Sequence, residues 1–422
     1  MNTFCIKTLG CKTNQLESQL IVQNLLENGF EQVEKAQSAK YFIINSCSVT
    51  SHTDKQTLSL IKQAKKKNNN IKVVLTGCLA QLLKEKPDYA DIILGNDEKL
   101  NISKHLEKSE VKDIFFVSEF NNQMLKKAST TRPFVKIQEG CDNRCSYCII
   151  PYARGKSRSN SIENIIGQIN TLAQNGHKEI VFTGTHLGQW GKECGMGLIE
   201  LLREVEKSDI HRYRLGSLYT NEITDEIIEV LAKSEKFCSH FHLSLQSLCD
   251  KTLKDMNRNY CTEEVFTLVK KLKKNFNLPF LGCDIIAGFP NEREEDFETT
   301  YKNLAKCGLS KIHAFPYSIR KGTPAADMKE QIPESIKKER TRKLISLSQE
   351  LYRNFLNENT GRRLEVLYEK KPKGQNKNTG ITRNYIRIFK ESNSDLQNTL
   401  ELLTLREEHF LNFEREFAYA DE

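Results

Sequence analysis

The sequence contains no long apolar run. No stretch approaches the ~20 consecutive apolar residues that a helix needs to cross a bilayer, and residues 1–7 lack the basic flank and apolar core of a secretory signal. Neither sign of charge dominates, since 63 Lys and Arg exceed 55 Asp and Glu by 8. Such an excess favours a polyanionic partner only weakly. We therefore expect a soluble, cytoplasmic protein with no membrane partner.

Cysteine, by contrast, is abundant, with 13 residues in a chain of 422. The cytoplasm keeps thiols reduced, so disulfides are not the expected use of these residues. Metal ligation and simple burial are the two roles that remain for these cysteines. The length of the chain predicts about three domains, and a hydrophobic fraction of 38% supplies enough material for their cores.

Three of the thiols, Cys141, Cys145 and Cys148, lie within eight residues, and no fourth accompanies them. A structural zinc site usually closes with four ligands, yet no His lies within twenty residues on either side. Three thiolates suit a cubane iron–sulfur cluster that leaves one iron open to an outside ligand. A trio of core cysteines is the alternative interpretation, but the polar and charged residues between them do not resemble a core.

Residues 1–120 predict an open parallel α/β sheet, because short apolar runs alternate with helical patterns such as 17–27 and 55–67. Cys11, Cys47 and Cys78 each follow directly after a strand-like run. The loops after parallel strands gather along one edge of a sheet, so these thiols can meet in space. This placement favours a second three-cysteine cluster over three unrelated cysteines. A polar linker, 121–132, follows.

Residues 133–358 predict a partial (β/α)6 barrel with its chemistry at the C-terminal face of the strands. The three-cysteine loop follows the first expected strand, Gly184 and Thr185 follow the second, and Gln246 follows the fourth. The six strand-like runs are 134–137, 179–183, 213–216, 241–245, 280–286 and 311–317, and helical patterns separate them.

Residues 359–422 predict a small β-barrel with strands at 364–368, 385–389 and 400–403, the first two separated by a lysine-rich turn at 370–379. Small β-barrels with basic loops and aromatic residues often bind single-stranded nucleic acid. Arg383, Tyr385 and Arg387 are the candidate contacts. The end of the chain, 406–422, predicts a helix or a tail.

Three blocks, residues 8–18, 136–155 and 284–290, make the whole chain resemble the radical S-adenosylmethionine methylthiotransferases. The resemblance implies an N-terminal cluster domain, a radical core and a C-terminal TRAM-like module. It implies that one [4Fe–4S] cluster cleaves S-adenosylmethionine and that a second carries the sulfur to be inserted, which another S-adenosylmethionine methylates. The first would be held by Cys141, Cys145 and Cys148 and the second by Cys11, Cys47 and Cys78, while Tyr147, Gly184, Thr185, Ser217 and Gln246 match positions near the cofactor.

The segment Cys11-Lys12-Thr13-Asn14-Gln15 is similar to the branch that modifies threonylcarbamoyladenosine beside the tRNA anticodon. The resemblance then implies addition of a methylthio group to carbon 2 of that base, with the tRNA anticodon stem-loop and an electron donor such as flavodoxin or ferredoxin as partners. Two alternatives remain. One is the same reaction on isopentenyladenosine, and the other is a non-catalytic iron–sulfur protein that binds RNA.

Three residues depart from the family pattern near the expected cofactor pocket. Tyr219 stands where Glu is usual, and Leu248 and Asn291 stand where Gly is usual. The departures leave both cysteine sets whole. The other seven cysteines lie in strand- or helix-like context and are predicted to be structural: Cys5, Cys194, Cys238, Cys249, Cys261, Cys283 and Cys307.

Overall fold

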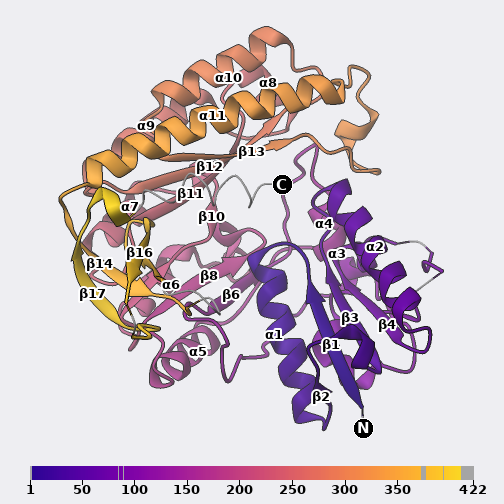
Figure 1. The fold of residues 1–422 in the computed structure, drawn as a ribbon. Coiled ribbons are helices and arrows are strands. Elements are labelled where there is room, and N and C mark those ends of the chain that lie inside the picture. The colour runs from indigo at the N-terminus through magenta and orange to yellow at the C-terminus, as the bar shows by residue number, and fades with distance from the viewer. Residues whose placement is uncertain (1, 84, 89, 372–376, 393, 410–422) are drawn as a thin grey trace.

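A computed structural model describes residues 2–83, 85–88, 90–371, 377–392 and 394–409. The N-terminal domain and the C-terminal sheet lie on different sides of a central α/β core (Figure 1). Within these residues, no helix combines the length and the apolar character needed to cross a membrane. The α/β fold class with parallel sheets is confirmed.

The N-terminal domain is an open parallel sheet with the strand order β2-β1-β3-β4-β5. Its helix α1 (Lys12–Glu27) contributes Ile21 and Leu25 to the core on one face, and α2 (Ser51–Lys67) contributes Ile61 to the core on the other. The sheet is apolar on both faces because helices cover both. The strands are β1 (Thr3–Thr8), β2 (Glu31–Gln32), β3 (Tyr41–Ser46), β4 (Lys72–Gly77) and β5 (Ile92–Ile93).

The central core consists of two four-stranded sheets, β7-β6-β8-β9 and β10-β11-β12-β13. The third strand of the expected barrel is split into β9 and β10 around Leu215 and Gly216. The other five expected strands are confirmed within a few residues. The strands are β6 (Phe134–Glu139), β7 (Arg158–Ser159), β8 (Glu179–Gly184), β9 (Arg212–Arg214), β10 (Ser217–Leu218), β11 (His240–Gln246), β12 (Phe280–Ala287) and β13 (Lys311–Pro316).

Amphipathic helices cover the outside of these strands, and their apolar faces join one large core. The expected helices are all present, with α11 (Glu334–Asn359) crossing the core to the C-terminal sheet (Figure 1). The short helix α4 (Ile150–Arg154) follows the three-cysteine loop. The others are α5 (Ile162–Gln174), α6 (Leu198–Val205), α7 (Asp225–Lys233), α8 (Asp250–Asp255), α9 (Thr262–Asn275) and α10 (Glu294–Lys306).

The C-terminal residues form an antiparallel sheet with the order β16-β15-β14-β17. Two details of the prediction were wrong. Residues 377–379, expected in a turn, belong to strand β15, and Tyr385, expected in a strand, lies in a turn with φ +64 before β16. The strands are β14 (Arg363–Tyr368), β15 (Lys377–Thr382), β16 (Arg387–Glu391) and β17 (Leu400–Thr404), whereas residues 410–422 of the expected tail lie outside the described residues.

Candidate active site and its two cysteine triads

The core triad, Cys141, Cys145 and Cys148, occupies the loop between β6 and α4. Gly140 turns the chain into this loop with φ +78, and a Cβ atom there would lie 1.9 Å from the carbonyl oxygen of Lys156. Only glycine fits this close approach of two backbone segments. The Cys148 amide donates a hydrogen bond to the Cys145 carbonyl over 3.0 Å, which folds the loop back on itself.

Burial makes these thiols poor acids. Burial, together with the smaller effect of the neighbouring thiols, raises the pKa of Cys141 and of Cys148 to about 12. Removing the protons from all three thiols would concentrate negative charge in a small volume unless cations bind there. Three converging thiols are therefore a donor set that fits a metal cluster, since metal binding replaces the thiol protons.

Polar side chains from other loops surround the core triad. The Nδ1 atom of His186 lies 3.4 Å from the Cys141 sulfur, and Arg258 donates a hydrogen bond to the Cys145 sulfur over 3.4 Å. The Tyr219 hydroxyl lies 3.8 Å from the same Cys145 sulfur. The Tyr219 ring stacks on His186 at 4.2 Å between centroids, and the Arg258 guanidinium lies 3.8 Å from its centre. Tyr219, the departure from the family pattern, is therefore part of the wall around the triad.

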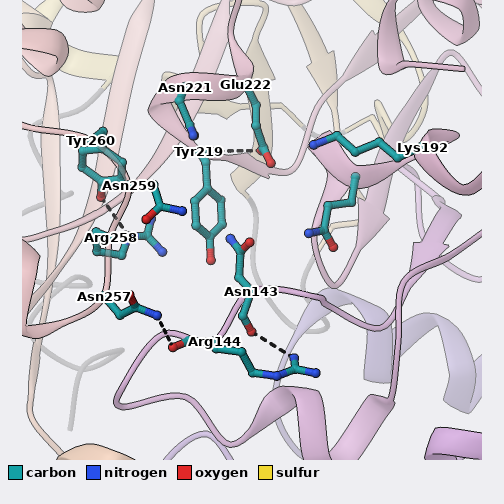
Figure 2. Close-up of a pocket in the computed structure, with 11 residues that line it drawn as sticks. Asn143, Arg144, Lys192, Tyr219, Asn221, Glu222, Asn257, Arg258, Asn259 and Tyr260 are labelled. Atoms are coloured by element: carbon teal, nitrogen blue, oxygen red, sulfur yellow. Dashed lines mark hydrogen bonds between the residues drawn. The ribbon is translucent and has the colours of Figure 1, made fainter. Parts of the chain in front are cut away.

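A polar pocket of about 270 Å³ lies on the outer side of this wall. Figure 2 shows Tyr219 extending from the segment of Asn221 and Glu222 towards the loop that carries Asn143 and Arg144. The exposed side chains of Arg144 and Lys192 add positive charge to the lining, beside Arg258. A single layer of side chains thus separates solvent from the Cys145 thiol.

The N-terminal triad, Cys11, Cys47 and Cys78, collects from three loops at one edge of the N-terminal sheet. All three line a single cavity of about 530 Å³. Gly10, with φ +97, passes so close to Cys47 that a Cβ atom would lie 2.4 Å from the Cys47 Cβ. Burial raises the pKa of Cys47 to about 12 and also raises that of Cys78, with nearby thiols adding to both shifts.

A buried ionic network joins the N-terminal triad to the core domain. Arg154 at the end of α4 donates to the Cys78 sulfur over 3.3 Å and also pairs with Glu17 at 2.9 Å and Glu139 at 2.7 Å. Although burial opposes ionisation, Arg154 and neighbouring lysines hold the pKa of Glu17 well below its usual range and that of Glu139 at about 2. Lys99 pairs with Glu17, and Lys136 pairs with both carboxylates.

The five predicted cofactor contacts divide between two adjoining cavities. Gly184, Thr185 and Ser217 line the cavity of the N-terminal triad, whereas Tyr147 and Gln246 line a smaller one of about 300 Å³ together with Cys148. The two cavities share Asp284 on their walls. The structure therefore brings the N-terminal triad, Cys148 and these five residues around two cavities that share part of their walls.

Several residues at these cavities escaped the sequence interpretation. The sequence interpretation assigned no role to His242. In the structure its Nδ1 atom lies 2.8 Å from the Ser217 hydroxyl and its Nε2 atom lies 3.4 Å from the Asp284 carboxylate. The sequence signal that could have identified His186 is its position just after strand β8, two residues beyond Gly184. The other residues that were missed are Lys12, Arg154, His240, Arg258 and His313.

The other two departures from the family pattern are structurally mild. Asn291 has φ +64, and Asn tolerates this left-handed conformation better than most residues other than Gly. Leu248 is fully buried and belongs to the large hydrophobic core.

Among the RNA-contact candidates, Arg383 instead pairs with Glu365 inside the contact between the domains, and only Arg387 is exposed.

Comparison with known proteins agrees with this architecture. A model of the radical SAM superfamily matches residues 135–304, and one described as uncharacterized protein family UPF0004 matches residues 3–95. The threonylcarbamoyladenosine tRNA methylthiotransferase MtaB of Aquifex aeolicus is 38% identical over 410 residues, covering 94% of this chain and 98% of that protein. The chain belongs to the radical S-adenosylmethionine tRNA methylthiotransferases.

Other relatives carry the same or a related name. The Bacillus subtilis threonylcarbamoyladenosine tRNA methylthiotransferase is 35% identical, covering 94% of this chain and 92% of that protein. The tRNA-2-methylthio-N(6)-dimethylallyladenosine synthase of Clostridium botulinum is 34% identical, covering 90% and 89%. As a member of this family the protein is a tRNA-modifying transferase that uses S-adenosylmethionine and a [4Fe–4S] cluster.

Solved structures show the same fold at low sequence identity. The radical S-adenosylmethionine methyltransferase TsrM from Kitasatospora setae superimposes with a TM-score of 0.55 at 12% identity, covering 77% of each chain. The match extends beyond the radical core alone, because that core model spans only residues 135–304 here.

Proposed function

We propose that the protein adds a methylthio group to carbon 2 of threonylcarbamoyladenosine beside the anticodon of tRNA. The observation that supports this substrate is the near full-length match, 94% of this chain and 98% of the relative, to an enzyme named for it. The dimethylallyladenosine enzyme of Clostridium botulinum matches at a lower identity, 34% against 38%. It provides the second candidate substrate.

The chemistry assigns a [4Fe–4S] cluster to each cysteine triad. When bound, the core cluster with S-adenosylmethionine would supply a radical that can attack an unactivated carbon–hydrogen bond, and the second cluster would supply the sulfur. Two sets of three thiols fit this assignment, because a cubane cluster held by three thiolates keeps one iron open for an outside ligand. Cys11, Cys47 and Cys78 line one cavity, and Cys148 lines a second.

The residues of this chain position the reactants and exclude water. Arg258 and Arg154 place a positive charge against one sulfur of each triad, at Cys145 and Cys78, where it would balance part of the negative charge of a thiolate-bound cluster. The smaller cavity, with Tyr147 and Gln246, is suited to S-adenosylmethionine because it adjoins Cys148. The larger cavity then receives the base of the anticodon stem-loop between the two triads.

An acidic electron carrier such as flavodoxin or ferredoxin would dock at the pocket of Figure 2. Arg144 and Lys192 offer the complementary charge, which speeds the encounter of oppositely charged proteins. Tyr219 and Arg258 line that pocket and also contact the Cys145 sulfur. The path from the carrier to the core triad is consequently short.

The direct test uses reconstituted protein, reductant, S-adenosylmethionine and tRNA that carries either threonylcarbamoyladenosine or isopentenyladenosine. Mass spectrometry of the digested nucleosides should find the 2-methylthio product from the first tRNA only. Product from the second tRNA alone would select the other substrate. A protein that never cleaves S-adenosylmethionine under these conditions would be a non-catalytic iron–sulfur protein, and the proposal would fail.

A further inference from the structure

One wall of the larger cavity carries a positive charge that neither cysteine triad requires. Lys12 follows Cys11 at the start of α1, is half-buried and lines the cavity. In the part of the chain that the structure describes, the side chain of Lys12 makes no hydrogen bond or ion pair. This distinguishes it from Arg154 on the same cavity, whose charge is already balanced by Glu17 and Glu139. An ammonium group left without a partner at the edge of a cavity is a ready site for an anion.

His240 on the same wall offers a second unused polar group. Its side chain is 3% exposed, and its Nδ1 atom has no hydrogen-bond partner among the described atoms. Burial lowers the pKa of His240 far below its usual value, and the charges of Arg214 and Lys12 lower it further, so the ring is neutral. Buried polar atoms are normally paired. Because His240 also lines the cavity, a ligand bound there can complete the hydrogen bonding of its ring.

Tyr385 completes this wall from the C-terminal domain. Its ring lies 4.0 Å from the His240 ring, measured between centroids, and it borders the cavity together with Lys12. Burial would raise the pKa of Tyr385, but the positive charges of Lys12, Arg132 and Arg214 hold it below its usual value. The electrostatic potential at this wall is therefore positive. Arg132 and Arg214 both have Glu179 as a partner, which leaves Lys12 as the available cation.

We propose that Lys12, His240 and Tyr385 form the subsite for the threonylcarbamoyl group of the substrate, with Lys12 paired to its carboxylate. The inference rests on the proposed function. A threonylcarbamoyl group presents a carboxylate, a hydroxyl and a carbamoyl unit, all of which can use this polar wall. A dimethylallyl group is a hydrocarbon and would bury Lys12 and His240 without partners, which is unfavourable. The same residues would thus bind one modified adenosine and reject the other.

The test compares ligands that differ only at the proposed contact. The probes are three RNA stem-loops whose single target base is threonylcarbamoyladenosine, its threonine carboxamide analogue or plain adenosine. Equilibrium binding to reconstituted protein is measured without reductant, so the result does not depend on turnover. Wild-type protein should bind the carboxylate about 10- to 100-fold more tightly than the amide, as expected for a hydrogen bond between charged groups. Lys12→Met should bind both alike.

Two variants control the measurement. Lys55→Met removes an equal charge from an exposed position on α2, outside the lining of the cavity, and should keep the preference for the carboxylate. Lys12→Arg should keep part of it. The iron content of each variant is measured first, so that loss of the adjacent cluster is not mistaken for loss of the ion pair.

Three results would overturn the inference. The first is that wild-type protein binds the amide and the carboxylate equally. The second is that Lys12→Met keeps the wild-type preference. The third is that Lys12→Met weakens the binding of all three RNAs equally, which would place Lys12 against an RNA phosphate or in a structural role. None of these affects the proposed function if threonylcarbamoyladenosine is still methylthiolated. Conversely, a wild-type protein that discriminates in binding but forms no product would support the subsite and reject the proposed reaction.

Discussion

The two cysteine triads are built in different ways. The core triad lies within eight residues of one loop, and its surroundings, such as Tyr219 and Arg258, come from the same central domain. The N-terminal triad is assembled from three separate strand ends, and its Cys78 is held by Arg154 from the central domain. One loop presents the ligands of the core triad by itself, whereas the N-terminal triad needs three strand ends to come together, and one of its sulfurs also contacts the central domain. Their responses to mutation should differ accordingly.

The largest effects should come from deleting each triad in turn. The Cys141→Ala, Cys145→Ala, Cys148→Ala variant should lose half of about eight irons per chain and all cleavage of S-adenosylmethionine. The matching variant at Cys11, Cys47 and Cys78 should also lose half of the iron and all methylthio product, but should still cleave S-adenosylmethionine. Iron analysis and chromatography of 5′-deoxyadenosine measure both. If the wild-type protein held the iron of only one cluster, Cys11, Cys47 and Cys78 would not be cluster ligands, and the comparison between the two triads would fail.

The docking of the two domains is tested next by Arg154→Leu. The change leaves Glu17 and Glu139 as buried carboxylates with fewer partners, and breaking such a pair costs about 3–5 kcal/mol of unfolding free energy. The variant should lose iron from the N-terminal triad before the core triad. Lys207→Met, which breaks an exposed pair with Glu204, is the control and should cost less than about 1 kcal/mol.

Lowering the pH should narrow the difference in unfolding free energy between the wild type and Arg154→Leu. In the wild type the pKa values of Glu17 and Glu139 are depressed, the latter to about 2. Their stabilisation is therefore complete above the unfolded-state pKa of about 4.3 and is lost as the pH falls towards 2. Without the guanidinium these carboxylates take up protons at higher pH than in the wild type, so the unfolding free energies of the two proteins should converge as the pH falls from about 4.3 towards 2. A constant difference across that range, measured by denaturant titration, would contradict the ionic role of Arg154.

A smaller effect is expected at the outer wall of the core triad. The double variant Arg144→Glu, Lys192→Glu reverses two exposed charges at the pocket in Figure 2. It should slow turnover about 10-fold with reduced flavodoxin or ferredoxin, because the encounter of complementary charges is lost. The rate with dithionite, a small chemical reductant, should not change. Equal slowing with both reductants would indicate damage to the triad instead of a docking surface.

The smallest effect on iron is predicted for cysteines outside both triads. Cys283 is fully buried on β12 and belongs to the large hydrophobic core. Cys283→Ala should leave iron per chain unchanged and lower the unfolding free energy by about 1 kcal/mol, as is usual for a small loss of buried volume. Iron loss in this variant would show that the two triads are not the whole ligand set.

Local patterns made most of the fold predictable. The parallel strands of the N-terminal domain and core are short apolar runs separated by amphipathic helices, and both signals are contained in neighbouring residues. Strand β15 was missed because Lys377, Asn378 and Gly380 have low strand propensity. Its pairing with β14 and β16 on both sides overrides that propensity. Tyr385 was placed in a strand for the opposite reason, since an aromatic residue in a β-rich segment gives no sign of a turn.

The sequence by itself determined the two sets of cysteines, because one is a compact local motif and the other follows a repeated position at strand ends. Only the tertiary structure decided what surrounds them. Arg154 reaches Cys78, and Tyr385 reaches the cavity wall beside Lys12 and His240, across distances in sequence that carry no local pattern. Such contacts depend on how whole domains pack, and each residue's partner becomes definite only when the sheets and helices that carry both are in place.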